Sequence, residues 1–355
     1  MWSLGTSMSG SGTINILDGG TFFNNGIQTV SSSNKFFING CGWCDPDGVK
    51  QGAISINANT TFTQAINVQS SACIKVHTNA NVIFSGLLSG SAPLNVGTLG
   101  TPVNGIHQYT NTGNTYDGIM TVDGTTISQS TGNSLQYAKI ILANGARIGS
   151  STSQTIGSLA SSDPTTYWSS ADFNNLFIKN NGVTTFAGRL LWNGGSNTAN
   201  WFLEGGSSNI ITLTGTGNTG NMYVRNGSKV ILQGATFTGT NGQIRVSAGS
   251  TVSAGTSTTG SAVLIYLDAT SALDVRAVGS STGIINTGTG TSSLSNGWKV
   301  NLLDPLPAGT HIIWKNTGAA ITQLPVIGTN LSGRTVTGFV WNNAVSPKTL
   351  SVILV

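Results

Sequence analysis

The chain has 355 residues, of which 48 are glycine, and only 7% are charged, against about 25% in typical globular proteins. Lys and Arg number 15 against 11 Asp and Glu, but the cations are scattered, which argues against nucleic-acid binding because that function needs clustered cations. The scarcity of Glu and Lys disfavours helices, and alternating hydrophobic residues, 38% of the chain, argue against disorder.

The N-terminal residues 1–80 are predicted to be a β segment or attachment region. Alternating apolar residues predict strands at Ala53–Ile56, Phe62–Val68 and Cys73–His77. Asp45–Gly48 reads as a turn, because Pro46 presets φ at its second position. The first residues, MWSLGTSMSG, lack the basic and apolar regions of a secretory signal. If Met1 is the natural start, we therefore expect synthesis in a cytoplasm.

The central residues 81–293 are predicted to be a β-solenoid. Short apolar alternations are cut by Ser-Gly, Asn-Gly and Asp-Gly pairs, which are strong turn signals. The phrase at Val82–Ser91 returns at Thr184–Gly195, and the phrase at Thr112–Val122 returns at Thr216–Val224. Repeated strand-plus-turn units are typical of solenoids. Ser150–Asp172, rich in Ser and Thr, is the segment where we expect an excursion and a binding loop.

The C-terminal residues 294–355 are predicted to be a β-rich cap or small β-sandwich module that also mediates oligomerisation. A solenoid needs such a cap because an open last turn leaves backbone edges unpaired. The chain finishes on an apolar strand, Leu350–Val355, which we expect to be tied into a sheet or an interface. The apolar character of this segment predicts a homo-oligomer, and analogy with fibres favours a trimer. The residues expected at the interface are Trp298, Trp314, Trp341, Leu350 and Val355.

The repeated phrase also resembles the strand repeat of bacterial autotransporter passenger domains, over roughly residues 81–242. The second copy keeps Phe186, Gly188 and Leu190. The resemblance implies a right-handed parallel β-helix and a surface adhesin, and it carries no catalytic residue. The matching residues are Phe84, Gly86, Gly90, Gly113, Asn114, Thr115, Tyr116, Gly118, Thr121 and Val122.

The cysteines and one histidine spell a possible zinc set, Cys41, Cys44, Cys73 and His77. On a strand, however, Cys73 and His77 lie roughly 13 Å apart, too far to share one tetrahedral ion. We expect no bound metal and no cofactor. A Cys41–Cys44 disulfide, or two reduced thiols with Cys73 facing the core, explains the cysteines more simply.

Enzymatic chemistry is not expected. Hydrolysis or elimination on polysaccharides needs converging carboxylates, and most of the 11 acidic residues precede Gly or Pro, where aspartate serves turns. Only Asp172, Glu204, Asp268 and Asp274 escape that interpretation, and they are far apart in the sequence. The three histidines lie in separate segments, so spacing indicates no nucleophile–base pair.

Aromatic residues near turns are the candidates for contact with a ligand, because exposed rings at coil corners can stack on sugars or form a protein interface. The competing interpretation is that they fill the ends of the solenoid or bury against another subunit. The candidates are Tyr109, Tyr116, Tyr167, Trp168, Trp192 and Trp201.

These observations predict an all-β parallel β-helix with a C-terminal cap, serving as a non-enzymatic structural or adhesion protein. The first hypothesis is a virion fibre or spike component on the virion surface. The second is an autotransporter-like or secreted adhesin on the bacterial surface, and a polysaccharide lyase or hydrolase is a distant third. The expected partners are other copies of the chain, virion or cell-surface proteins, and a host glycan or receptor. Neither nucleic acid nor a membrane span of ~20 apolar residues is expected.

Overall fold

The structure is a computed structural model, and it describes residues 2–4, 11–25, 28–30, 33–44, 46, 50–97, 105–171, 174–179, 182–192, 199–238, 242–257 and 260–355. The regular elements in these residues are all β-strands. The predicted fold class is confirmed: the strands form a parallel β-solenoid of about 11 turns, with additional sheet structure at the C-terminus. The chain divides into two compact units, one ending at Leu176 and one beginning at Phe177.

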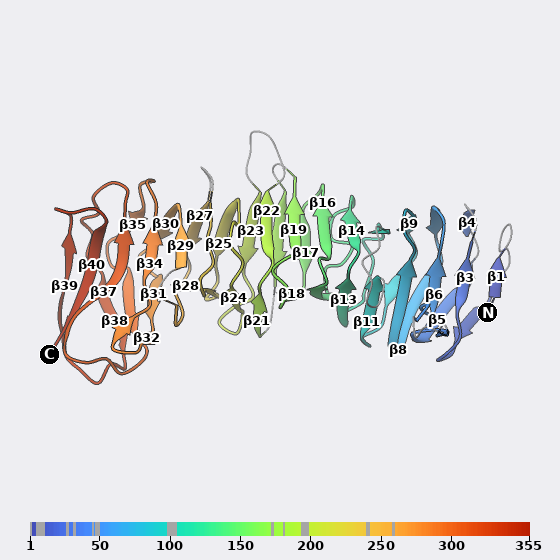
Figure 1. The fold of residues 1–355 in the computed structure, drawn as a ribbon, viewed down its shortest axis with the longest axis horizontal. Coiled ribbons are helices and arrows are strands. Elements are labelled where there is room, and N and C mark those ends of the chain that lie inside the picture. The colour runs from blue at the N-terminus through green and yellow to red at the C-terminus, as the bar shows by residue number, and fades with distance from the viewer. Residues whose placement is uncertain are drawn as a thin grey trace. The chain divides into compact units, whose positions relative to one another are not determined.

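The first unit stacks its strands in parallel ladders, to which successive turns of the chain add strands (Figure 1). One ladder contains β1 (Trp2–Leu4), β3 (Phe22–Asn24), β6 (Ile54–Ile56), β8 (Ala65–Val76), β11 (Leu94–Gly97), β13 (Ile119–Asp123), β15 (Lys139–Ala143) and β18 (Ser158–Ser161). A second contains β2 (Thr13–Ile16), β5 (Lys35–Gly40), the start of β8, and β10 (Leu88–Ser89). A third contains β4 (Gln28–Val30), β7 (Thr60–Phe62), β9 (Asn81–Phe84), β12 (Ile106–Tyr109), β14 (Thr126–Gln129), β16 (Arg147–Ser150) and β19 (Tyr167–Ser170).

Alternating side chains of these strands fill the interior of the first unit. The inward residues form columns in which each turn contributes one member, such as Phe62, Phe84 and Tyr109 on successive strands of the third ladder. Their ring centroids are 5.9 Å and 5.1 Å apart, and all three side chains are buried. Every second residue of each strand is apolar and points inward, and stacking the strands in register places these residues next to one another. The result is a continuous apolar core along the stack.

Two predictions about the first unit need correction. The segment Ser150–Asp172 holds β17 (Gln154–Ile156), β18 and β19 in its described residues, so it belongs to the coil stack and is not an excursion from it. The residues 1–80 also contribute β3, β5, β6 and β7 to the ladders, so the stack begins well before Asn81. The attachment role of this segment stays a prediction.

The second unit repeats the same construction, following β20 (Asn175–Ile178) and including β22 (Arg189–Trp192). One ladder contains β21 (Val183–Phe186), β24 (Ile210–Leu213), β26 (Lys229–Leu232), β28 (Thr251–Ser253), β31 (Ala272–Val275), β36 (Lys299–Leu302) and β38 (Val326–Asn330). Another contains β23 (Asn200–Leu203), β25 (Asn221–Val224), β27 (Gln243–Val246), β30 (Leu264–Leu267) and β35 (Ser293–Leu294).

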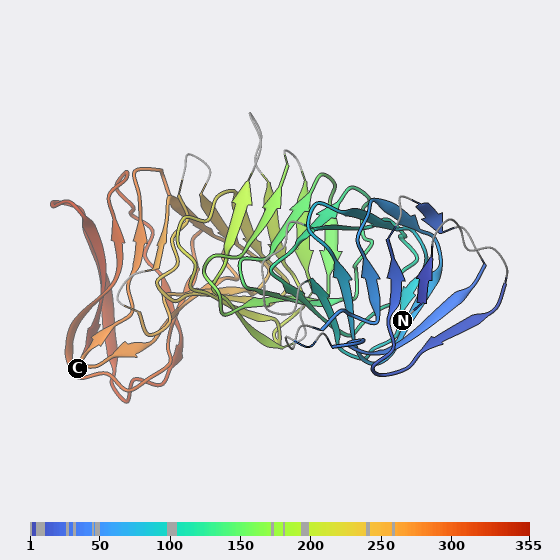
Figure 2. The same ribbon diagram turned by 45° about the vertical axis from the view of Figure 1, so that its right-hand side comes forward.

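The C-terminal strands change from parallel to antiparallel pairing. The strands β29 (Gly260–Ala262), β34 (Ile285–Thr287) and β37 (Gly309–Asn316) form a parallel ladder. The last strand, β40 (Lys348–Leu354), then lies antiparallel between β37 and β39 (Val336–Asn342), in orange and red in Figures 1 and 2. A short antiparallel pair, β32 (Ala277–Val278) and β33 (Ser281–Thr282), precedes them. The prediction that the final strand is tied into a sheet is confirmed.

The repeated segments Thr112–Val122 and Thr216–Val224 have the same structural role in the two units. The buried Asn114 accepts a hydrogen bond from the Leu88 backbone N–H (2.7 Å) and donates to the Ser134 carbonyl (2.8 Å). In the second copy, Asn218 accepts from the Leu190 N–H at 2.9 Å and donates to the Thr236 carbonyl at 3.1 Å. The phrase therefore satisfies backbone groups of neighbouring turns where water cannot reach them.

Close backbone contact explains a glycine of the repeated segment Val82–Ser91. A Cβ atom at Gly86 would lie 1.8 Å from the Gln64 carbonyl oxygen of the preceding turn. The Asn144-Gly145 pair serves a corner instead, because both residues have positive φ, 52° and 71°. It separates β15 from β16, which belong to different parallel ladders, so the pair turns the coil and does not form a hairpin.

We predict that Asn114→Ala lowers the free energy of unfolding by roughly 2 kcal/mol, because it leaves the buried Leu88 N–H without its acceptor. Urea unfolding followed by circular dichroism measures this change. Asn296→Ala is the matched control, since Asn296 is exposed and its substitution should change stability by less than about 0.5 kcal/mol. Equal effects of the two substitutions would show that the buried hydrogen bonds do not stabilise the turn.

Candidate functional site

Four of the six aromatic residues expected to contact a ligand lie inside the coils. The side chains of Tyr109, Tyr116, Trp168 and Trp201 are at most 2% exposed. The Tyr116 hydroxyl lies 2.9 Å from the Ala92 carbonyl oxygen, and Trp201 Nε1 donates to the Thr219 carbonyl at 2.8 Å. The expectation of exposure is corrected for these four residues. Internal backbone acceptors satisfy the polar atoms of Tyr116 and Trp201 in the core, Trp168 Nε1 donates to the Ser150 hydroxyl, and the buried Tyr109 hydroxyl has no hydrogen-bond partner.

Tyr167 and Trp192 are the two candidates that remain partly exposed. The Tyr167 ring lies in register with Arg147 of the neighbouring strand, and the Arg147 Cζ atom is 5.3 Å from the ring centroid. This is a cation–π distance. Trp192 is anchored through its backbone N–H, which donates to the Thr219 hydroxyl at 2.7 Å. Ligand contact by these two residues stays a prediction.

The C-terminal tryptophans form the core of the cap. Trp298, Trp314 and Leu350 are fully buried within one chain, and the Trp298 and Trp314 ring centroids are 6.1 Å apart. Trp341 is half-buried, and its Nε1 donates to the Gln323 carbonyl at 3.0 Å. The three buried side chains therefore cannot form the predicted subunit interface, which corrects that assignment. Val355 remains exposed.

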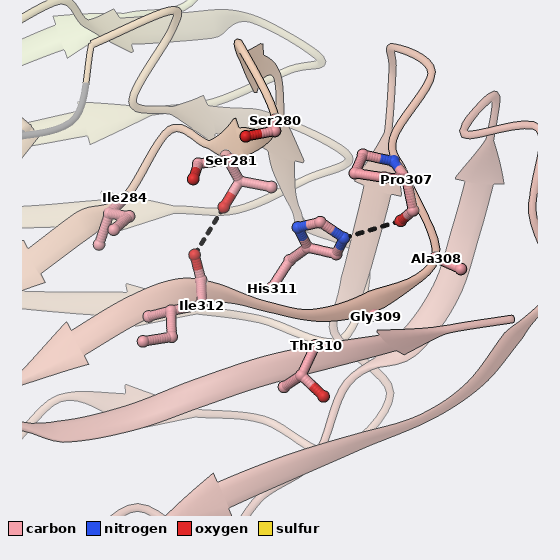
Figure 3. Close-up of a pocket in the computed structure, with 10 residues that line it drawn as sticks. Ser280, Ser281, Ile284, Pro307, Ala308, Gly309, Thr310, His311 and Ile312 are labelled. Carbon is pink, nitrogen blue, oxygen red and sulfur yellow. Dashed lines mark hydrogen bonds between the residues drawn. The ribbon is translucent and has the colours of Figure 1, made fainter.

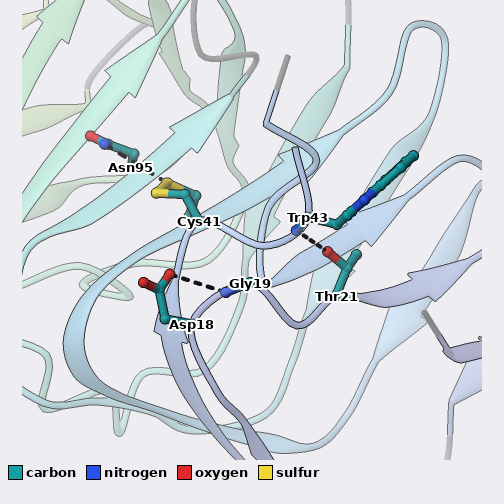
Figure 4. Close-up of a disulfide and its surroundings, with 7 residues drawn as sticks. Asp18, Gly19, Thr21, Cys41, Trp43 and Asn95 are labelled. Atoms are coloured by element: carbon teal, nitrogen blue, oxygen red, sulfur yellow. Dashed lines mark hydrogen bonds between the residues drawn. A yellow bond between two sulfur atoms is a disulfide. The ribbon is translucent and has the colours of Figure 1, made fainter. Parts of the chain in front are cut away.

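The cysteines pair differently from the expectation. Cys41 and Cys73 form a disulfide that joins neighbouring turns (Figure 4). Cys44 is an exposed free thiol. Cys41 and Cys44 are therefore not bonded to each other. The four residues that spell a possible zinc set are also divided, because Cys41 and Cys73 are bonded to each other and His77 Nε2 lies 2.9 Å from the Ser55 hydroxyl. Among the described residues, no group of three His, Cys, Asp or Glu side chains is placed to hold a metal ion.

A shallow pocket of about 360 Å³ lies between the segments 280–284 and 307–312 (Figure 3). His311 is the one titratable side chain among its lining residues. Its Nε2 atom lies 2.9 Å from the Pro307 carbonyl oxygen, and the Thr282 hydroxyl donates to the Ile312 carbonyl at 2.6 Å. The pocket contains no acid–base pair and no nucleophile–base pair.

Several aspartates hold the corners of the coils. Burial opposes the charged form of Asp163, but hydrogen bonds from Thr165 and Gly145 together lower the pKa of this carboxyl group. Asp268 has the same arrangement: burial opposes ionisation, and donors that include Ser271 lower its pKa. Two further carboxylates are engaged in ion pairs, Lys229–Asp274 and Arg276–Asp304. These acids accept structural hydrogen bonds or neutralise cations of other turns, with Asp304 one turn from Arg276 and Asp274 two turns from Lys229.

His107 is a core histidine. Its side chain is fully buried, neither ring nitrogen has a hydrogen-bond partner, and the ring stacks on Phe84 with centroids 5.9 Å apart. Burial lowers the pKa of His107 from 6.5 to about 3, because the charged ring cannot be solvated in the core. The neutral ring therefore serves packing.

A row of outward-facing aromatic and arginine side chains is the feature that the sequence analysis missed. We call it the arginine–aromatic ladder, and it consists of Phe177, Phe202, Tyr223, Arg225, Arg245 and Tyr266. Phe202, Tyr223, Arg245 and Tyr266 are in register on β23, β25, β27 and β30. The signal was present in the sequence, because each of these four residues lies between two buried apolar residues of a short strand.

No family model matches the chain, and no curated protein matches its sequence. In the part of the chain that the structure describes, no helix has the length and apolar character needed to cross a membrane. The candidate site therefore rests on the geometry of this chain alone.

We predict that the free energy of unfolding falls on acidification because of His107. Below pH 6.5 the unfolded chain binds a proton at this residue, whereas the folded chain does so only near pH 3. Stability should drop by about 1.4 kcal/mol for each pH unit within this window. His107→Phe should reduce the loss between pH 7 and pH 4.5 by roughly 2–3 kcal/mol, as measured by urea unfolding at both pH values.

His77→Gln is the control for the same measurement, because His77 is only partly buried and its Nε2 lies beside the Ser55 hydroxyl. It should leave most of the acid dependence in place. An unchanged pH slope in His107→Phe would mean that His107 is not held neutral in the core.

Proposed function

We propose that the chain is a non-enzymatic structural and adhesion protein that assembles with copies of itself at its C-terminal end and is displayed on a surface. A virion fibre or spike component is the first form of this proposal. The observation that carries it is the concentration of exposed apolar side chains in the C-terminal segment. Eight of the fourteen large exposed hydrophobic residues in the described part of the chain lie between residues 312 and 355.

Three of these eight residues, Val326, Ile327 and Val340, lie on β38 and β39, and each of these strands is unpaired on one side. β38 pairs with β36 and ends its ladder, and all five of its residues are exposed. β39 pairs with β40 and ends the antiparallel sheet. Monomeric β-proteins protect such edges with charges, and β38 carries none. An apolar edge of this kind is suited to pairing with the same edge of another copy, and a trimer is the favoured assembly by analogy with fibres.

A bacterial surface adhesin, exported or autotransporter-like, is the second candidate. The repeat that resembles passenger domains favours it, although Asn114 and Asn218 explain that repeat structurally as well. The Cys41–Cys73 disulfide supports either surface location, because disulfides persist in extracellular and virion environments. Co-purification with intact virus particles would select the fibre, and retention on the outer face of bacterial cells would select the adhesin.

We predict that the wild-type chain sediments as an oligomer and that Val326→Lys with Val340→Lys converts it into a folded monomer. Both valines are about half exposed, at 48% and 50%, so the lysines can reach water without disturbing the cap. They place charge on both unpaired edges. Sedimentation velocity measures the mass, and circular dichroism confirms that the variant remains folded.

Val183→Lys is the control, because Val183 is 71% exposed on β21 and lies far from the C-terminal strands in the sequence. It should keep the wild-type mass. A wild-type chain that is monomeric at every concentration, or an edge variant that keeps the full oligomer mass, would overturn the assembly proposal. Point substitutions are preferable to deletion of Leu294–Val355, because β36 and β37 in that segment complete the coil stack.

A further inference from the structure

The arginine–aromatic ladder is an ordered row on the outer face of the second unit. Phe202, Tyr223, Arg245 and Tyr266 occupy the same register position on four neighbouring strands. The residues on either side of them in each strand are buried, so these four side chains point out of the coil. Neighbouring strands are about 4.8 Å apart. Tyr223, Arg245 and Tyr266 are at least partly exposed at these intervals, whereas Phe202 is covered by its neighbours and only 7% exposed.

The rings and guanidinium groups hold one another in place. The Phe177 and Phe202 centroids are 4.8 Å apart, and those of Phe202 and Tyr223 are 4.7 Å apart, with interplanar angles of 11° and 22°. Arg225 Cζ lies 4.1 Å from the Phe202 centroid, and Arg245 Cζ lies 4.4 Å from that of Tyr266. These stacking and cation–π contacts order two side chains that are otherwise mobile, which lowers the entropy lost when they bind a ligand.

Neither arginine is neutralised by a carboxylate. The ion pairs among the described residues are Lys229–Asp274 and Arg276–Asp304, and they leave Arg225 and Arg245 out. Two acids lie near the arginines. Asp268 accepts hydrogen bonds from Thr270, Ser271 and the Ala248 N–H, and Glu204, which follows the register partner of Val224 and so lies across from Arg225, is in neither of these ion pairs. Arg245 donates only to Gln243 Oε1, at 3.3 Å and 3.0 Å. Guanidinium donors on both residues therefore remain for an external anion.

The chemistry of this row selects a class of ligand. A guanidinium group binds a carboxylate or sulfate through two parallel hydrogen bonds, and the tyrosine hydroxyls and Gln243 can bond to sugar hydroxyls. A single-stranded nucleic acid fits less well, because its bases need free ring faces and its phosphates need more cations. In the ladder, the faces of Phe202 and Tyr223 are covered by neighbouring rings and by Arg225.

We propose that the arginine–aromatic ladder binds an acidic saccharide chain running along the stack of β23, β25, β27 and β30, with its carboxylate or sulfate groups on Arg225 and Arg245. This inference rests on the proposed role in adhesion and names the ligand that the adhesive surface takes. The ladder lies outside the C-terminal edges that carry the assembly proposal. The two proposals can therefore fail independently.

The test uses the full chain and calorimetric binding of a short oligogalacturonate and a sulfated oligosaccharide, beside an uncharged oligosaccharide of similar length. The wild-type chain should bind at least one acidic probe more tightly than the uncharged probe, and added salt should weaken that binding. Arg225→Gln and Arg245→Gln should each lower the affinity about tenfold or more, because each removes a charge-assisted contact. Thermal unfolding and sedimentation should show unchanged folding and mass.

Arg147→Gln is the matched control, since Arg147 also lies over a tyrosine ring but in the first unit and outside the ladder. It removes the same charge and should leave the affinity unchanged. Four results would overturn the inference: absence of binding to both acidic probes, equal binding of the uncharged probe, equal loss in Arg147→Gln, or tighter arginine-dependent binding of single-stranded oligothymidylate. Because the oligomer mass is measured separately, none of these results would by itself disprove assembly.

Discussion

The parallel ladder is the interaction on which the rest of the structure depends. A strand of three to five residues cannot satisfy its backbone or bury its apolar face alone, so each turn is stable only against its neighbours. In-register pairing aligns equivalent side chains along the stack. It gives the inner column of Phe62, Phe84 and Tyr109 and the outer row of Phe202, Tyr223, Arg245 and Tyr266. The same geometry leaves the last strands β38 and β39 unpaired on one side. The core, the row proposed to bind a ligand and the edge proposed to mediate assembly therefore have one structural cause.

The fold was predictable because its local signals agree. Alternation in segments such as Ala53–Ile56, turn pairs such as Asn144-Gly145, and the scarcity of helix-forming residues all favour short strands joined by corners. The registers that join distant strands were not predictable, since pairing partners about 20 residues apart are determined by packing along the stack. The Ser- and Thr-rich segment after Ser150 shows this limit, because its composition resembles a loop and yet the structure places β17, β18 and β19 there.

The site was predicted less well than the fold, and the errors have a common physical origin. Tyr116 and Trp201 lie near turns in the sequence, but the coil supplies carbonyl acceptors inside it, so their polar atoms are satisfied in the core. Trp314 was assigned to an interface and instead bonds through Nε1 to the Thr287 hydroxyl within the cap. The ladder was missed because its members are about 20 residues apart and become neighbours only when strands are in register. The sequence around any one of these residues does not indicate a row. The recurrence of an aromatic residue or arginine between two apolar residues, in one short strand after another, is the sequence pattern that predicts it.

Cysteine cross-linking between adjacent turns tests the central claim, the parallel in-register ladder, most directly. Thr212 and Ile231 are paired on β24 and β26, and their Cα atoms should be about 4.8 Å apart, within the range that a disulfide spans. In a Cys44→Ser background, Thr212→Cys with Ile231→Cys should form an intrachain disulfide under mild oxidation, seen by mass spectrometry of the digested protein. Thr212→Cys with Lys229→Cys, displaced by two residues on the same strand face and about 8 Å apart, should remain reduced. Cross-linking of the displaced pair, or its absence in the aligned pair, would contradict the account.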